Sequence, residues 1–181
     1  MNGSNGNITS GSAHVYVRSN GVWSEQQKLT ASDGAVNDYF GYFVSIDGDT
    51  AVISAYGDDD NGAESGSAYV FVRNNGVWSE QAKLTASDGA AGDRFGEKSV
   101  SIDGDTVVIG SFRSGSYTGS AYVFVRSNDV WSEQQKLTAS DGAAGGDQFG
   151  YSVSIDGDTA VIGARVDDTA SMVNLDGGAE G

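Results

Sequence analysis

Residues 66–96 read GSAYVFVRNNGVWSEQAKLTASDGAAGDRFG, and one close copy of this stretch precedes it while another follows it. A shorter piece, SIDGDTAVI or SIDGDTVVI, recurs after each copy. The tryptophans mark the period, because Trp23 lies 55 residues before Trp78 and Trp78 lies 53 residues before Trp131. A tandem period of this length predicts a solenoid, a propeller or an array of small units.

The composition suits many short strands joined by tight turns. The chain has 181 residues, of which 38% are hydrophobic, with 27 glycines and no proline. A chain of this length normally forms one domain with its own core. In a repeat protein, however, each unit depends on its neighbours for the burial of its apolar surface.

Charge and cysteine usage exclude several classes of partner and site. Ten basic against 25 acidic side chains give a formal net charge of −15, which repels phosphate backbones and argues against nucleic acid. The chain has no cysteine, so a disulfide framework and thiolate metal sites are excluded. No stretch approaches the roughly 20 apolar residues of a membrane span, so we expect no membrane insertion. The first ten residues lack the pattern of a secretory signal.

Each period contains two predicted β-hairpins. In the first, side chains alternate between apolar and polar over Ala13–Arg18, and an Asn-Gly turn leads to a return strand over Val22–Thr30. In the second, a strand through Tyr42–Ile46 meets Thr50–Ala55 across an Asp-Gly turn. Tandem four-stranded antiparallel units predict an all-β fold of β-propeller blades. The middle copy has one extra residue in its inner strand, which predicts a β-bulge near Glu97 and Lys98.

A Phe-Gly pair precedes an apolar strand in every copy, at Phe40-Gly41, Phe95-Gly96 and Phe149-Gly150, and a Val-Ile strand follows. With these motifs the chain resembles the FG-GAP repeat family, the blade unit of integrin α-subunit propellers and of many bacterial surface proteins. The resemblance implies a propeller, usually of seven blades, that acts in extracellular adhesion or recognition. The Asp-Gly turns are too short to wrap a calcium ion, so the calcium loop of integrin blades is not carried over to them.

The resemblance also sets the phase of the blades. It makes 11–164 the propeller region, preceded by a flexible tail over 1–10 and followed by a loop or truncated inter-blade connection over 165–181. The region begins with an outer strand pair at 13–30 and ends with an inner pair at 149–164, which gives two whole blades and two half-blades, or three blade equivalents. Open half-blades predict either a homo-oligomer that closes a ring by half-blade exchange or the remainder of a longer propeller.

Two sets of side chains are candidate binding residues. Trp23, Trp78 and Trp131 are candidates for stacking on a carbohydrate ligand, although packing between blades is the simpler interpretation. The most acidic loop offers oxygen ligands for calcium, and its alternative is a solvated loop. The residues of this candidate metal site are Asp58, Asp59, Asp60, Asn61 and Glu64.

No catalytic constellation is recognisable. His14 is the only histidine, and tyrosine takes its place in the other copies, which argues against a histidine-based hydrolase. The sequence therefore favours a non-enzymatic adhesion, protein-interaction or scaffolding module at the cell surface or outside the cell. The alternatives are a lectin-like propeller that binds glycans and an accessory propeller segment of a larger secreted protein.

Overall fold

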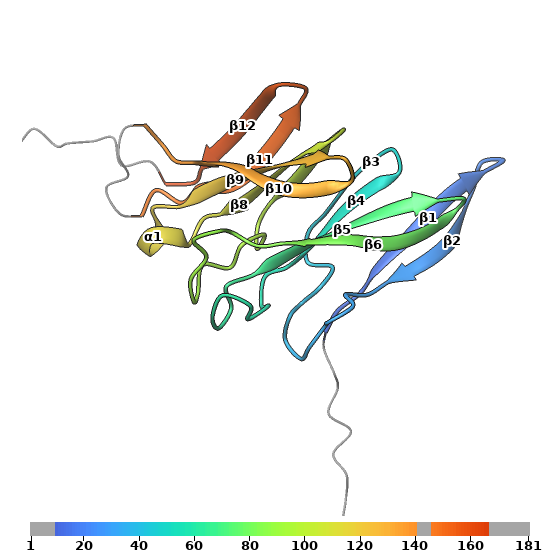
Figure 1. Cartoon of the computed structure of the whole chain (residues 1–181), viewed down its shortest axis with the longest axis horizontal. Coiled ribbons are helices and arrows are strands. Elements are labelled where there is room, and N and C mark those ends of the chain that lie inside the picture. The colour runs from blue at the N-terminus through green and yellow to red at the C-terminus, as the bar shows by residue number, and fades with distance from the viewer. Residues whose placement is uncertain (1–9, 141–145, 167–181) are drawn as a thin grey trace, which may run out of the picture.

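The computed structural model of the chain describes residues 10–140 and 146–166, and their strands form four separate antiparallel sheets (Figure 1). The predicted tail over 1–10 and segment over 165–181 lie almost wholly outside these described residues. The strands are β1 Ala13–Ser19, β2 Val22–Leu29, β3 Val44–Asp47, β4 Thr50–Ala55, β5 Ser67–Asn74, β6 Val77–Leu84, β7 Val100–Asp103, β8 Thr106–Ser111, β9 Ser120–Ser127, β10 Val130–Leu137, β11 Phe149–Asp156 and β12 Thr159–Ala164.

The sheets confirm the predicted division into whole and half-blades. Strands β3-β4-β5-β6 form blade 1, and β7-β8-β9-β10 form blade 2 in the same order. The pair β1-β2 is the N-terminal half-blade, which corresponds to the outer strands of a blade, and β11-β12 is the C-terminal half-blade, which corresponds to the inner strands. Short hairpin turns lie at one end of the strands. The loops 31–43, 56–66, 85–99 and 112–119 lie at the other end, which we call the long-loop face (Figure 1).

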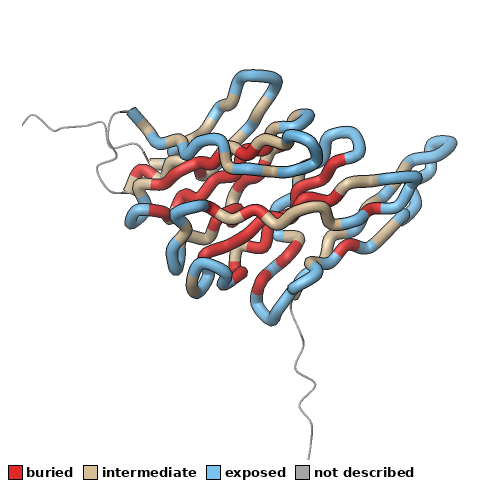
Figure 2. The backbone as a smooth tube through the Cα atoms, viewed as in Figure 1, coloured by how far each residue is buried: buried red, intermediate tan, exposed pale blue. Residues whose placement is uncertain are grey.

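The hydrophobic cores lie between blades. Ile53 and Tyr69 of blade 1 pack in a cluster with Leu29 of the N-terminal half-blade, whereas Val52 and Val70 pack in a second cluster with residues of blade 2. Successive side chains of a strand point to opposite faces of its sheet, so each strand of a whole blade supplies both clusters. All six residues of β4 are consequently buried. Figure 2 shows that the buried backbone is concentrated in the two whole blades.

A repeated backbone joint connects each outer strand pair to the next blade. The amide of Phe95 donates to the carbonyl oxygen of Ser65 at 2.9 Å, and Phe40 and Phe149 make the same bond to Ser10 and Thr118. The glycine after each of these acceptors has a positive φ, and a Cβ at Gly66 would lie 2.4 Å from the Phe95 carbonyl oxygen. Only glycine fits such a position without displacing the backbone, which explains why Gly-Ser and Phe-Gly recur together.

The extra residue of the middle copy lies in a turn ahead of β7. The amide of Gly110 bonds to the Ser99 carbonyl, while the Gly110 carbonyl accepts from Gly96, so Glu97 and Lys98 both lie between the two bonded positions. The insertion therefore lies at Glu97 and Lys98 as predicted, but it forms part of a turn and not a bulge within the strand, since β7 begins only at Val100. The turn absorbs the insertion, so the pairing of β7 with β8 has no register shift.

One short element was not expected from the sequence. The segment α1, Ser114–Tyr117, is a single turn in which Gly115 and Ser116 have left-handed backbone angles. It replaces the acidic loop of blade 1 in the corresponding place after β8. In the described part of the chain, no helix has the length and the apolar character needed to cross a membrane.

We predict that Phe95→Ala lowers the free energy of unfolding by about 3–5 kcal/mol, because it leaves a cavity between blades. The ring is 1% exposed and packs edge-on against Tyr122 and Phe124, with centroids 5.5 and 6.0 Å away. Urea unfolding measures the loss. The control Val77→Ala, at a side chain that is 61% exposed, should change stability by less than about 0.5 kcal/mol. Equal effects of the two variants would contradict inter-blade burial.

Candidate functional site

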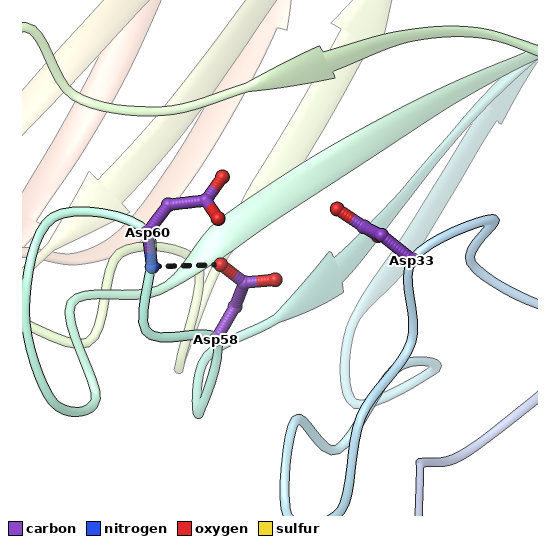
Figure 3. Close-up of side chains that lie close together, drawn as sticks. All are labelled: Asp33, Asp58 and Asp60. Carbon is purple, nitrogen blue, oxygen red and sulfur yellow. Dashed lines mark hydrogen bonds between the residues drawn. The ribbon is translucent and has the colours of Figure 1, made fainter.

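Three carboxylates and one ammonium group converge on the long-loop face of blade 1. One oxygen from each of Asp33, Asp58 and Asp60 lies within 4.8 Å of the others, and Figure 3 shows the three side chains directed toward a common centre. The Nζ atom of Lys83 is 2.7 Å from Asp33, 2.8 Å from Asp58 and 2.7 Å from Asp60. The lysine thus supplies the positive charge that this cluster of acids requires.

Asp58 is the buried member of the cluster. Its carboxylate accepts hydrogen bonds from the amide of Asp60, the Ser67 hydroxyl and the Tyr69 hydroxyl, at 3.2, 2.9 and 3.0 Å. The residue is only 4% exposed. A buried carboxylate needs both paired charge and hydrogen bonds to offset its lost hydration. These contacts therefore fix the position of the acidic loop after β4.

The pKa shifts of Asp33 and Lys83 favour the charged form of each group. Burial lowers the pKa of Lys83, but hydrogen bonds to Asp33, Asp58 and Asp60 outweigh it and raise the pKa above the usual value. Burial raises the pKa of Asp33, yet the bonds from Lys83 and Tyr69 leave that pKa below its usual value. The pKa of Tyr69 is raised by burial and by its bonds to Asp33 and Asp58. At neutral pH Asp33 is therefore ionised, Lys83 is protonated and Tyr69 is neutral.

The same pairing recurs in blade 2 without the two loop acids. Tyr122 donates to Asp88 at 2.8 Å, and Lys136 bonds to the same carboxylate at 2.7 Å. Because Asp33 and Asp88 each lie in a loop that connects two blades, both lysines tie the connecting loop to the outer strands of the following blade. The shared part of the cluster is therefore structural, and only Asp58 and Asp60 are particular to blade 1.

The five residues predicted to bind calcium do not converge on one point as a single ligand shell would. Asp58 and Asp60 converge, but Asp59 accepts from the amide of Glu64 at 2.7 Å, and the Asn61 side chain donates to the Ala86 carbonyl at 3.2 Å. Glu64 forms an ion pair with Arg94 of the next inter-blade loop. Sequence analysis missed the third acid, Asp33, and the central lysine. Calcium at this loop remains a prediction, and the ion would compete with Lys83 for the same oxygens.

Two of the three tryptophans lie between neighbouring sheets. The Trp78 indole is 3% exposed, and its Nε1 donates to Gln26 of the N-terminal half-blade at 3.0 Å. Trp131 is half-buried and bonds in the same way to Gln81 of blade 1 at 2.8 Å. Trp23 is 65% exposed. Stacking of a sugar on Trp78 would require its indole to leave the inter-blade contact, whereas Trp23 is exposed.

An exposed aromatic group on the long-loop face was not anticipated from the sequence. Tyr39 stacks on Tyr56 with centroids 4.9 Å apart, and Tyr42 meets the same ring edge-on at 4.6 Å. The Arg94 guanidinium lies 5.3 Å above the Tyr56 ring. Tyr39 and Tyr42 are 39% and 45% exposed. We call these four residues, with Phe43 and Lys98 beside them, the aromatic band.

His14 lies on the exposed surface of β1, where its Nδ1 contacts Glu25 at 2.9 Å. Its Nε2 lies 3.3 Å from the Ser12 hydroxyl. His14 also borders a mainly apolar groove between β1 and blade 1. Its polar contacts are those of a surface cross-strand pair.

The repeated joints agree with a comparison against known families. The FG-GAP repeat model matches residues 23–71, 78–124 and 131–179. The chain belongs to the FG-GAP repeat family. Each match starts at a tryptophan of an outer strand and continues through the Phe-Gly joint into the next blade. A search of curated proteins finds no match.

We predict that Asp33→Asn is less stable than the wild type at neutral pH and that the difference disappears in acid. The folded-state pKa of Asp33 lies below its ordinary value of 3.8, so the ionised group stabilises the fold above about pH 4. That contribution is lost as the pH falls through the folded-state pKa. Urea unfolding across this range measures both proteins, with Asp88→Asn as the equivalent change in blade 2. A pH-independent difference would contradict the account.

A second prediction separates lysine from calcium as the cation of the cluster. Chelator should leave the melting temperature of the wild type unchanged. Lys83→Gln leaves three carboxylates without an ammonium group, so the variant should melt lower and recover in millimolar calcium. The matched control Lys136→Gln faces a single carboxylate and should show no recovery. A wild type that melts lower in chelator would show that calcium, rather than Lys83, holds the acids together.

Proposed function

We propose that the chain is a non-catalytic recognition and scaffolding module that acts outside the cell or at its surface and binds a protein ligand through the aromatic band. The single observation that carries the proposal is this exposed group of tyrosines with arginine on the long-loop face. Tyrosine and arginine are enriched among the residues that dominate binding energy at protein interfaces.

The position of the aromatic band supports the proposal. Its residues come from the loops 31–43, 56–66 and 85–99, which the rigid inter-blade cores hold in place. Loops on a rigid scaffold are the usual carriers of recognition. None of these tyrosines belongs to either hydrophobic core cluster, and Tyr39 and Tyr42 are 39% and 45% exposed, so both can contact a ligand.

A protein ligand is preferred over the alternative of a glycan. The glycan hypothesis depended on the three tryptophans, and Trp78 has no free ring face. An accessory role within a larger secreted protein is compatible with the same binding face, because family membership by itself supports only an interaction module.

The proposal is tested by binding of the purified chain to a panel of immobilised extracellular-matrix and cell-surface proteins, with a glycan array in parallel. We expect at least one protein to bind. Tyr39→Ser/Tyr42→Ser should weaken that binding about tenfold or more, since each ring contributes of order 1 kcal/mol or more at an interface.

The control is Val22→Ser/Val130→Ser, at hairpin turns away from the long-loop face, where the side chains are 68% and 66% exposed. It should bind like the wild type. Binding to glycans alone would favour the lectin-like alternative, and equal binding by the two double variants would refute a role for the aromatic band.

A further inference from the structure

We propose that the joint between blades 1 and 2 holds a binding site for a neutral sugar, at the end of the strands opposite the long-loop face. The site lies between two whole blades, beside the short hairpin turns of β5-β6 and β9-β10 (Figure 1). It is separate from the aromatic band and goes beyond the protein-binding function proposed above. Two differences between the inter-blade joints of the chain support it.

Two glutamines close the joint between the N-terminal half-blade and blade 1. Gln26 accepts from the indole Nε1 of Trp78 at 3.0 Å and donates to the carbonyl oxygen of Gly76 at 3.1 Å. Gln27 accepts from the backbone N–H of Trp78 at 2.9 Å and donates to the Trp78 carbonyl oxygen at 2.8 Å. One carboxamide thus satisfies both backbone groups of the tryptophan that face the preceding sheet.

The joint between blades 1 and 2 makes only one of these four bonds among the described residues. Trp131 holds the place of Trp78, since each lies opposite an arginine of its hairpin partner strand. Gln81 still accepts from the Trp131 Nε1 at 2.8 Å, but Ala82 stands where Gln27 stands in the preceding joint. In the described part of the chain, no side chain bonds to the backbone N–H or C=O of Trp131.

The turn of the β9-β10 hairpin is the second difference. It reads Asn128-Asp129, where the other two outer hairpins read Asn-Gly. Asp129 has a φ of +64°, a backbone conformation that favours glycine. Its side chain is exposed and forms no hydrogen bond or ion pair within the described residues. Strained residues gather at ligand-binding sites, so an aspartate held in this way without an internal partner indicates an external one.

A polar groove with a volume of about 480 Å³ lies between the two whole blades at these turns. Gln81 of blade 1 and Asp129 of blade 2 both line it. In the preceding joint the equivalent residues, Gln26 and Gly76, are joined by a hydrogen bond that closes the same place. The groove has the size of a small-ligand site.

The charges of the groove favour a neutral ligand. Its two arginines are each held by an aspartate of the same blade, Arg73 by Asp49 at 2.6 Å and Arg126 by Asp105 at 2.7 Å. These charges cancel, and Asp129 adds one negative charge, so a phosphate group is disfavoured. Within the described residues, the acids of this groove do not converge closely enough to hold a metal ion.

Two adjacent hydroxyl groups of a sugar match the backbone groups that Ala82 leaves without a side-chain partner. In the preceding joint one carboxamide serves both groups of Trp78, its oxygen as acceptor and its nitrogen as donor. A pair of adjacent hydroxyls can do the same at Trp131, because one accepts from the N–H while the other donates to the C=O.

The rest of the lining favours a sugar over a peptide side chain. The groove also presents the carboxylate of Asp129 and the carboxamides of Asn74 and Asn128. Further hydroxyls of a pyranose ring can donate to the carboxylate and exchange hydrogen bonds with the carboxamides. A glutamine side chain of a peptide would use only the two backbone groups of Trp131. A neutral hexose is therefore the ligand class that fits this joint.

Titration calorimetry of the full chain with the methyl glycosides of glucose, galactose and mannose tests the site, and NMR spectra of isotope-labelled protein locate it. We expect at least one glycoside to bind saturably and to shift the backbone amide signals of Trp131 and Asp129. Its fully O-methylated form, which has no hydroxyl donor, should not bind. A wild type that binds none of the glycosides, or that shifts only at other residues, would overturn the proposal.

Ala82→Gln tests the site from the protein side. It gives this joint the carboxamide that Gln27 supplies to the preceding one, so the variant should melt higher and bind the glycoside about tenfold more weakly or worse. The matched control is Ala90→Gln, at an exposed position of the loop 85–99, which should bind like the wild type. Equal affinity of Ala82→Gln and the wild type would refute the site.

Asp129→Gly is a second variant, needed because Ala82 packs against the inter-blade core, where a longer side chain can disturb folding. It copies the Asn-Gly turn of the other outer hairpins, so it should be at least as stable as the wild type and bind the glycoside about tenfold more weakly. Unchanged affinity would contradict the role of this aspartate in the site. Tighter binding of a glutamine-containing tripeptide than of any glycoside would overturn the assignment to a sugar.

Discussion

Burial of both faces of every blade is the constraint on which this structure depends. Within β4, Ile53 packs toward the N-terminal half-blade and Val52 packs toward blade 2, so neither cluster forms inside a single sheet. A lone four-stranded blade would expose two apolar faces to water. Stability in such a molecule comes largely from nearest-neighbour interfaces, as in other repeat proteins. The two half-blades, which have fewer neighbouring strands in this structure, bury less of their surface than the whole blades.

The polar contacts repeat with the same period as the cores and set the order of the blades. Three kinds of polar contact connect one sheet to the next. They are the backbone joint between Ser65 and Phe95, the Gln81–Trp131 hydrogen bond and the Lys136–Asp88 ion pair. The acidic cluster around Lys83 is an elaborated form of one of these connections. The copies differ mainly on the long-loop face, where blade 1 carries the acidic loop and the aromatic band.

Much of the fold could be predicted from the sequence, because the same strand and turn patterns recur at the same positions in every copy of the repeat. Four strands per period and the two hairpins follow from alternation and turn residues. The blade phase follows from the resemblance to the FG-GAP family that the Phe-Gly motif carries. The side-chain cluster could not be predicted, because Asp33, Asp58 and Lys83 come from three segments whose meeting depends on how blades pack. The two-residue turn at Glu97 and Lys98 also depended on tertiary context, since the sequence cannot show whether an insertion lies inside a strand or before it.

The central claim is that the blades are stabilised by the apolar cores that lie between neighbouring sheets, and one substitution in each core tests it most directly. Ile53→Ala removes apolar surface from the core between the N-terminal half-blade and blade 1, and Ile109→Ala removes it from the core between blades 1 and 2. The account predicts that each variant lowers the free energy of unfolding in urea by about 2–5 kcal/mol. A loss below about 0.5 kcal/mol for either variant would contradict it.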